Sequence, residues 1–257
     1  MGLLKRIYWL ITLQFSLDPW RIICAFRALP RYAVDWYRFR KGYRGRMLLR
    51  PCLHDHHAEG GAVGDEYFLQ DLHVARKIFQ KNPDIHVDIG SRIDGFVAHV
   101  ASFRNIELFD IRPVRSAPPG IIFRQIDMMS SDALRLVGYC DSISCLHALE
   151  HFGLGRYGDP ISPYGYRTGF TNMVNMLKKG GMFYLSLPVG VERVEFNAHR
   201  VFNPHTIMQL AAESKMVLQE FSWIFGGELL HSTDFHGDMQ RLSESEYALG
   251  IFSFTRQ

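Results

Sequence analysis

The spacing of apolar residues changes along the chain and predicts its elements. Over 65–81 apolar positions recur at three- and four-residue intervals, which predicts a helix that Asn82-Pro83 ends. Beyond it, short apolar runs alternate with polar and glycine-containing segments, a pattern typical of strands and helices in turn. Strands are predicted over 85–89, 106–109, 121–126, 142–146, 182–187, 217–225 and 247–254, and helices over 96–103, 132–137, 169–177 and 203–212.

Strands that alternate with helices indicate βαβ units and therefore a mainly parallel sheet. Between the last two strands we expect only a loop, 226–246, whose length allows an antiparallel connection. The chain has 257 residues, of which 47% are hydrophobic and 21% charged, and these ordinary globular values exclude wholesale disorder. We therefore expect one α/β domain over 51–257, preceded by a different kind of segment.

Residues 1–50 differ from the rest in charge. They hold eleven Lys/Arg and two acidic residues, a formal charge of +9, whereas 51–257 hold 18 bases and 24 acids, a formal charge of −6. The net charge of +3 hides this asymmetry. The acidic domain argues against contact with nucleic acid, and the first segment is interpreted as a basic, aromatic, helical N-terminal arm.

Aromatic residues of the arm alternate with arginine, which suits a helix lying at a membrane interface. Its first apolar stretch, 7–17, is far shorter than the roughly 20 residues of a spanning helix. The alternative is an arm packed on the body or on a second subunit. The four cysteines form no C-x-x-C pair, so we expect reduced thiols in a cytoplasmic protein, peripheral at the membrane if the arm binds lipid.

Polar residues stand where the predicted strands end. Asp88, Gly90 and Ser91 belong to the end of the first strand, Asp110 ends the second, and Asp127 ends the third. In an open α/β sheet, ligands bind at the carboxyl ends of the strands. Asp110 can there accept bonds from ribose hydroxyls, and Asp127 can accept one from an adenine amino group.

The turn after the first strand lacks a glycine that bound pyrophosphate needs. The run from Gly90 to Gly95 keeps the first and last glycine of G-x-G-x-x-G without the central one, and it is no Walker loop. This disfavours a nicotinamide-dependent dehydrogenase. A nucleoside without phosphate fits better, and S-adenosylmethionine is such a ligand, with a net positive charge that an acidic pocket attracts.

Several motifs then occur in a fixed order: Val87-Asp-Ile-Gly90, Asp110, Asp127, the run 141–151, and Leu177-Lys-Lys-Gly-Gly181. This set, over about residues 65–257, resembles the class I S-adenosylmethionine-dependent methyltransferase superfamily. The resemblance implies a Rossmann-like, seven-stranded, mainly parallel sheet with the last strand antiparallel and helices on both faces. It implies a methyltransferase whose cofactor site is formed by Asp88, Gly90, Ser91, Asp110, Ile111, Asp127, Met128 and His147.

The segment 153–160, together with 88–96, further resembles a little-characterised branch of that superfamily associated with glycan-assembly loci. This implies O-methylation of a sugar or glycan intermediate, and hence a role in glycan biosynthesis with a small-molecule or glycan acceptor as partner. The oligomeric state is left open. The rival hypothesis is a catalytically silent methyltransferase-like protein that docks a partner or a membrane through its basic arm. The incomplete glycine motif favours this rival, and the intact Asp110 and Asp127 pair opposes it.

Candidates for removing the acceptor proton follow the fourth strand. His151 is the predicted general base because imidazole titrates near neutral pH. Glu150 stands beside it, and Asp159 is the reserve. Each has a structural alternative, such as His147 capping the strand end or Arg156 and Asp159 forming an ion pair that stabilises the loop.

His147 to His151 also spells H-x-x-E-H, which binds zinc on a helix in inverted zinc proteases. Here it follows a strand, so the required helical context is missing. It is also similar to the E-x-x-E-H by which some quinone-pathway O-methyltransferases hold a divalent ion, but the first residue here is histidine. A divalent metal ion is therefore optional, and no metal site is predicted there or at the histidine cluster 54–57. On the helix 65–81, Tyr67 and Gln70 are expected to face a ligand.

Overall fold

The computed structural model describes residues 7–8, 11–12, 15–58, 60–61 and 63–257, and the chain divides into two compact units, 1–62 and 63–257. In the first unit, α2 (Pro19–Gly42) begins because Asp18 caps it, accepting hydrogen bonds from the backbone N–H groups of Trp20 and Arg21. The apolar stretch 7–17 lies partly outside the described residues.

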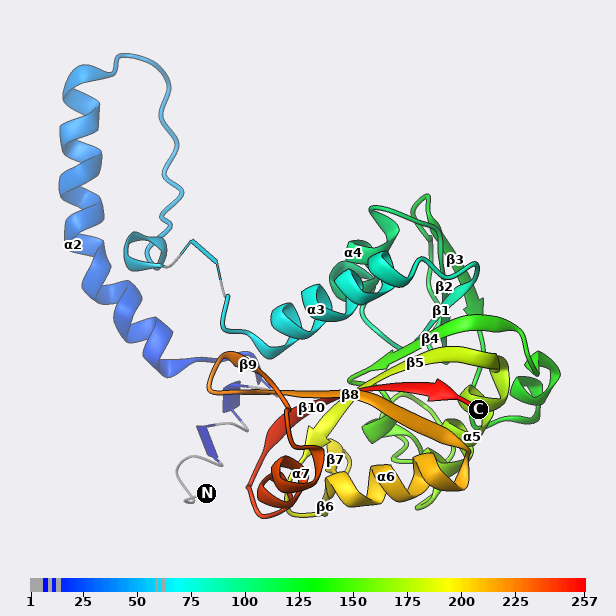
Figure 1. The fold of residues 1–257 in the computed structure, drawn as a ribbon. Coiled ribbons are helices and arrows are strands. Elements are labelled where there is room, and N and C mark those ends of the chain that lie inside the picture. The colour runs from blue at the N-terminus through cyan, green and yellow to red at the C-terminus, as the bar shows by residue number, and fades with distance from the viewer. Residues whose placement is uncertain (1–6, 9–10, 13–14, 59, 62) are drawn as a thin grey trace. The chain divides into compact units, whose positions relative to one another are not determined.

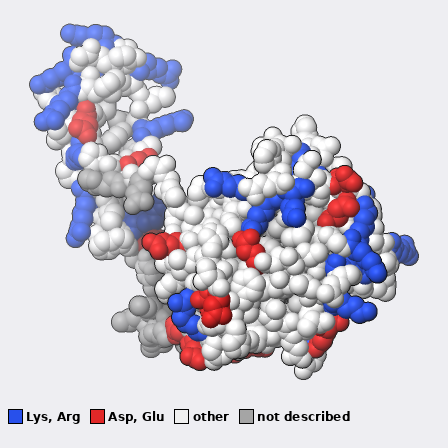
Figure 2. All heavy atoms as spheres, viewed as in Figure 1, with Lys and Arg blue, Asp and Glu red and all other residues white. Residues whose placement is uncertain are grey.

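The helix α2 buries none of its residues, although it carries many large apolar side chains. It is followed by a short helical turn, η1 (Asp55–His57). Lysine and arginine side chains crowd this unit, with few acidic ones between them (Figure 2). Among the helices that the structure describes, none has the length and apolar content needed to cross a membrane.

The second unit is built on an eight-stranded sheet with the order β3-β2-β1-β4-β5-β10-β8-β9 (Figure 1). Neighbouring strands are parallel from β3 to β5, whereas β10 is antiparallel to both β5 and β8. The strands are β1 (His86–Ile89), β2 (Ile106–Asp110), β3 (Ile121–Gln125), β4 (Cys140–Leu146), β5 (Leu177–Val189), β8 (Met216–Phe225), β9 (Glu228–His231) and β10 (Ala248–Arg256).

Helices cover both faces of this sheet, as Figure 1 shows. One face packs against α3 (Glu66–Lys81), η2 (Ile93–Val97) and α4 (Ala98–Ala101), and the other against α5 (Gly165–Met176), α6 (Pro204–Glu213) and α7 (Phe235–Ser243). Apolar side chains form a separate core on each face. Short elements complete the unit: η3 (Ser131–Leu136), η4 (Leu149–His151), β6 (Arg193–Glu195) and β7 (His199–Val201). The predicted Rossmann-like fold class is confirmed, including the antiparallel last strand, but the sheet has eight strands and not the seven expected.

The prediction of a plain loop over 226–246 is wrong, because this segment contains β9 and α7. Gly226 and Gly227 both adopt positive φ angles, of 62° and 82°. Two such residues between strands form a tight hairpin turn, and β9 therefore pairs with β8 as an eighth strand. The helix α7 forms because Asp234 caps it and because Met239 and Leu242 are buried against the core.

Candidate functional site

A cavity of about 50 Å³ lies where β1, β2 and β3 end. Most of the predicted site residues meet there, from both the cofactor set and the catalytic set. The lining includes Gly90, Asp110, Ile111, Asp127, Met128, His151 and Asp159. The carboxyl edge of the parallel strands thus brings together residues that are up to 70 positions apart in the sequence, as the topology of an open α/β sheet requires.

Asp88 and Ser91 lie beside this cavity without lining it. The Asp88 carboxylate is fully buried and accepts hydrogen bonds from the Ser91 backbone N–H at 3.0 Å, the Ser91 hydroxyl at 2.9 Å and the Ser144 hydroxyl at 2.5 Å. Burial raises the pKa of Asp88 to about 7, and these hydrogen bonds oppose that shift. The hydrogen bonds between Asp88 and Ser91 therefore stabilise the turn after β1.

The backbone of that turn explains why two glycines are present in it. Gly90 has a φ of +75°, and a Cβ atom there would lie 3.0 Å from the Cβ of Ala148. A Cβ at Gly95 would lie 3.0 Å from a carboxylate oxygen of Asp71. Glycine at both positions thus allows β1, η4 and α3 to approach one another closely.

Asp110, the expected ribose ligand, is bound to Arg112 in this structure. The guanidinium donates from Nε to Oδ1 at 3.0 Å and from Nη2 to Oδ2 at 2.5 Å, and it lies 4.6 Å from the centre of the Tyr157 ring. The Asp110 side chain is 7% exposed, whereas that of Arg112 is 41% exposed. The Arg112 side chain thus pairs with Asp110, one of the residues that line the cavity, and itself reaches solvent.

His147 occupies a turn at the end of β4 that needs a left-handed backbone, with a φ of 52°. Its Nδ1 atom lies 2.9 Å from Oε1 of Glu150, and its ring packs against the Tyr67 ring with centroids 4.5 Å apart. Glu66 approaches the other ring nitrogen, Nε2, to 3.7 Å. Because a non-glycine residue rarely adopts such a φ angle, a strained turn at this strand end marks a candidate functional position.

His147 and Glu150 form an ion pair that is almost completely withdrawn from water. Burial alone would lower the pKa of His147, but the hydrogen bond and charge of Glu150 outweigh it and raise that pKa. Burial likewise opposes the charge on Glu150, yet the bond to His147 holds its pKa below the usual value. Among the described residues, the Nε2 atom of His147 and the Oε2 atom of Glu150 are buried and have no hydrogen-bond partner.

His151 is oriented by the carbonyl oxygen of Ala198, which lies 2.7 Å from Nδ1. Because Nδ1 donates to this carbonyl, the lone pair of the neutral ring is on Nε2, 3.8 Å from Oε1 of Glu150. Burial lowers the pKa of His151, so the ring is neutral at pH 7 and its Nε2 lone pair is free to accept a proton. The geometry suits a general base whose protonated form Glu150 would stabilise.

Asp159 lines the cavity, but its carboxylate already accepts three backbone hydrogen bonds. They come from the N–H groups of Gly153 at 2.7 Å, Gly155 at 3.2 Å and Tyr157 at 3.2 Å. This favours a role in holding the loop. The ion pair considered as its alternative is not formed, because Arg156 instead donates to the carbonyl oxygen of Ala198 at 2.8 Å.

Arg200 has a role that sequence reasoning missed. Its buried guanidinium donates to the carbonyl oxygens of Glu150, Phe152 and Pro163. It thereby ties the segment after β4 to the β7 strand. No local sequence signal reveals such a role, because the partners are backbone atoms some 37 to 50 residues away.

On helix α3, Tyr67 and Gln70 were expected to face a ligand, and their environments differ. Gln70 does not face a ligand, because it is buried, donates to Asp71 at 2.9 Å and accepts from the Ser186 hydroxyl. Tyr67 is 44% exposed and covers His147. That Tyr67 faces a ligand therefore stays a prediction, whereas Gln70 is part of the buried packing below His147.

A family model described as "Caenorhabditis protein of unknown function, DUF268" matches residues 125–248. This stretch, somewhat under half of the chain, includes Asp127, the run 147–151 and Asp159, and it leaves out Asp88 and Asp110. No curated protein matches the sequence.

Solved structures match the second unit's architecture at low identity. The Burkholderia thailandensis 1,6-didemethyltoxoflavin-N1-methyltransferase, crystallised with S-adenosylhomocysteine, is 12% identical with a TM-score of 0.51, over 74% of this chain and 80% of that one. The [4+2]-cyclase SpnF is 12% identical with a TM-score of 0.51, over 73% and 79%. A geranyl diphosphate methyltransferase in complex with GPP and sinefungin is 9% identical with a TM-score of 0.50, over 72% and 78%.

These similarities establish the class I methyltransferase fold. They do not by themselves assign a reaction, since one of the three proteins is named as a cyclase. The function has to be argued from the residues at the strand ends.

Proposed function

We propose that this protein is an S-adenosylmethionine-dependent methyltransferase that acts on a hydroxyl group, and that its acceptor is a sugar or glycan intermediate. The observation that carries the proposal is the cavity in which Asp110, Asp127 and a base, His151, meet at the carboxyl edge of the sheet. The acceptor class follows from the resemblance of the segments 88–96 and 153–160. A hydroxyl also suits a site that holds a base, since an acceptor oxygen has a proton to lose.

The side chains at the site fit the adenosine part of S-adenosylmethionine. Asp110 would bind the ribose hydroxyls, Asp127 the adenine amino group, and Gly90 would let the backbone pass close to the nucleoside. Bound S-adenosylmethionine supplies an electrophilic methyl carbon attached to a sulfonium leaving group. The residues of the chain then have three tasks: to bind, to exclude water, and to remove the acceptor proton.

The present cavity is too small for a nucleoside. Pockets that hold drug-sized ligands enclose about 300–1,000 Å³, and this one has about 50 Å³. Arg112 covers Asp110 and packs on Tyr157, so binding would displace the guanidinium from the carboxylate. Its partly exposed side chain can make this movement without disturbing the core.

Proton removal would be carried out by Nε2 of His151. Its Nδ1–H group stays bonded to the Ala198 carbonyl, which fixes the ring. Glu150, 3.8 Å from Nε2, would stabilise the imidazolium that forms. His147 holds Glu150 in place through the 2.9 Å contact and acts as a positioning residue.

Calorimetry with the complete protein tests the cofactor part. We expect S-adenosylhomocysteine to bind and NAD not to bind. The variant Asp110→Ala should lose about 10- to 100-fold in affinity, since hydrogen bonds to a charged group contribute about 1.5–3 kcal/mol. Asp94→Ala is the matched control, because Asp94 is an exposed acid next to the same turn and pairs only locally with Arg92. Equal affinities in both variants would contradict the assigned pocket.

Turnover separates the enzyme from its rival, the catalytically silent protein. Transfer of radiolabelled methyl groups to a panel of sugar nucleotides and glycan lipids would establish the acceptor class. Cofactor binding together with no transfer to any acceptor would favour the silent protein. The silent protein is a realistic alternative because SpnF, which has this fold, is named as a [4+2]-cyclase and not as a methyltransferase.

We further propose that the arm binds an anionic membrane surface. Ile22, Phe26, Leu29 and Trp36 recur at four- and three-residue spacings and therefore lie along one side of α2, and all are exposed. The opposite side carries Arg27, Arg31 and Arg38. A helix with an exposed apolar stripe and an arginine-rich face is typical of interfacial binding.

Vesicle cosedimentation with the complete protein tests this. Binding should be stronger to vesicles with phosphatidylserine than to phosphatidylcholine alone, and it should weaken with salt. Phe26→Ser and Trp36→Ser should weaken it, whereas Val34→Ser, on the arginine side of α2, is the matched control. Equal loss in all three variants would contradict the assigned stripe.

A further inference from the structure

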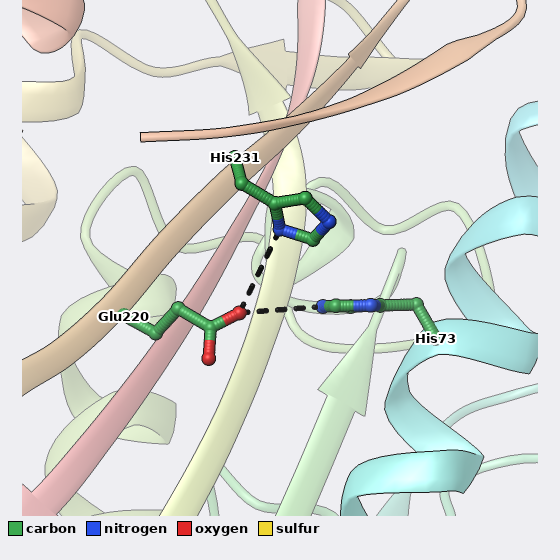
Figure 3. Close-up of side chains that lie close together, drawn as sticks. All are labelled: His73, Glu220 and His231. Atoms are coloured by element: carbon green, nitrogen blue, oxygen red, sulfur yellow. Dashed lines mark ion pairs between the residues drawn. The ribbon is translucent and has the colours of Figure 1, made fainter. Parts of the chain in front are cut away.

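Three side chains from separate elements converge beside the edge of the sheet (Figure 3). They are His73 of α3, Glu220 of β8 and His231 of β9. Oε1 of Glu220 lies 3.7 Å from Nε2 of His73 and 3.9 Å from Nδ1 of His231. The ligand atoms of all three residues lie within 4.8 Å of one another, and both rings point toward the same carboxylate oxygen (Figure 3). We call these residues the edge cluster.

The strand geometry explains the convergence. Side chains alternate along β8, so that Phe221 enters one core while Glu220 and Ser222 face α3. The register between β8 and β10 shifts next to Glu220, which is the signature of a β-bulge, and bulges re-aim side chains. His231 is the cross-strand partner of Ser222 and therefore lies on the same face.

The chemistry of the edge cluster is that of a metal-ligand set. The Nε2 atom of His73 is buried and has no hydrogen-bond partner, so it offers an unused lone pair in its neutral form. Two imidazoles and one carboxylate are ligands that zinc and related divalent transition metals prefer.

We propose that His73, Glu220 and His231 bind one divalent transition metal ion, with zinc as its representative. Ligand atoms on a tetrahedral zinc ion lie about 3.4 Å apart, given bond lengths of about 2.0–2.1 Å. The observed 3.7 Å and 3.9 Å would therefore shorten by a few tenths of an ångström on binding. Three protein ligands leave one position for water.

Two neighbours of the edge cluster define how the ion would bind. Lys77 pairs with Oε2 of Glu220, so the carboxylate would bind through Oε1 alone, and the lysine charge would reduce the affinity. The Ser222 hydroxyl lies 2.9 Å from Nδ1 of His231 and would give up this contact. The bound ion would link β8 and the edge strand β9 to α3, and it would do so independently of the cavity at the strand ends.

The experiment uses the complete protein after chelator treatment, titrated with zinc chloride in a calorimeter, with thermal unfolding as a second readout. We expect one zinc per chain and a higher melting temperature with zinc. His231→Ala and His73→Ala should each weaken binding by at least about tenfold. Lys77→Met should strengthen it, because it removes a like charge. His236→Ala, an exposed histidine outside the cluster, should change nothing.

Three results would overturn the proposal. The first is no heat of zinc binding and no thermal shift in the wild-type protein. The second is equal zinc affinity in the His231→Ala and His236→Ala proteins. The third is loss of binding on replacing His54 and His56 of the first unit instead. Because His231 is exposed, its variant is expected to fold, and far-ultraviolet circular dichroism checks this directly.

Discussion

Two groups of two histidines and one glutamate lie in the same unit and behave in opposite ways. In the group of His147, Glu150 and His151, the glutamate side chain is 1% exposed and lies 2.9 Å from a histidine nitrogen. In the edge cluster, the side chain of Glu220 is 39% exposed and the shortest histidine contact is 3.7 Å. The pKa of His147 is raised, whereas that of His73 is lowered to about 4.

The difference shows what decides the charge of a buried imidazole. Burial acts in the same direction in both groups, toward the neutral ring. At 2.9 Å, Glu150 offsets that penalty through a hydrogen bond in addition to its charge. Glu220 is too far from His73 for such a bond, and Lys77 neutralises part of its charge. The first group is therefore a charged pair beside a candidate base, whereas in the second a neutral imidazole, His73, lies near a carboxylate that pairs with Lys77.

The largest expected difference between the two groups is in the rate of methyl transfer. We expect His151→Asn to reduce turnover about 100- to 10,000-fold, the usual contribution of a general base, with little change in S-adenosylhomocysteine affinity. The matched control is His231→Asn from the edge cluster, which should leave turnover unchanged. Methyl-transfer kinetics on a responsive acceptor make the measurement.

The pH profile adds an independent readout of His151. Only its neutral form accepts a proton, and its pKa is lowered from 6.5. Activity of the wild-type protein should therefore fall only when the pH drops below 6.5, and this acidic limb should be absent from the residual activity of His151→Asn. An unchanged limb would assign the base to another group.

The next effect is on stability. Glu150→Gln should lower the free energy of unfolding by about 3–5 kcal/mol at pH 6, because it leaves the buried His147 charge without its partner. Glu220→Gln should cost about 0–1 kcal/mol in metal-free protein, since solvent screens this half-exposed carboxylate. Urea unfolding of both variants makes the comparison, and equal losses would remove the distinction drawn between the two groups.

The sequence predicted the first group because its members lie within five consecutive positions after a recognisable strand. The same holds for Asp110 and Asp127, since parallel strands bring their carboxyl ends to one edge whatever the details of packing. The mainly parallel sheet was predictable for a similar reason, and the antiparallel last strand was implied by the resemblance to the methyltransferase superfamily. The parallel sheet follows from the alternation of strands and helices, and the resemblance depends on the order of the motifs.

The edge cluster was not predictable in the same way. Its residues come from one helix and two strands: His73 and Glu220 are 147 positions apart, and Glu220 and His231 are 11 apart. One of the two strands, β9, was expected to be a loop. The pairing of Arg112 with Asp110 was also missed, because a charge two residues beyond a strand end can turn toward either solvent or the site. Contacts that depend on side-chain direction or on a bulge have no periodic signature in the sequence.

The smallest expected effect is on the pH dependence of stability. The contributions of His73 and His147 to the free energy of unfolding change with pH in opposite directions. The pKa of His73 falls from 6.5 in the unfolded chain to about 4 in the folded protein. Below pH 6.5 the unfolded state therefore binds a proton more readily, and stability is lost as the pH falls toward 4. The pKa of His147 is raised, so its contribution is fully present below pH 6.5 and is lost as the pH rises through the folded value.

Urea unfolding of chelator-treated protein between pH 5 and pH 8.5, about the range in which histidine titrates, tests both signs. In His73→Asn, the free energy of unfolding should decrease less on acidification than in the wild-type protein. The difference between the two proteins should not exceed about 3 kcal/mol. His147→Asn should cost more at pH 6 than at pH 8.5, because the charged form that Glu150 stabilises is then the populated one. The lowered pKa of Glu150 keeps its own contribution intact above pH 4.5. If both variants shift the wild-type curve by a constant amount at every pH, then neither histidine changes its proton affinity on folding, and the contrast between the two groups reduces to packing.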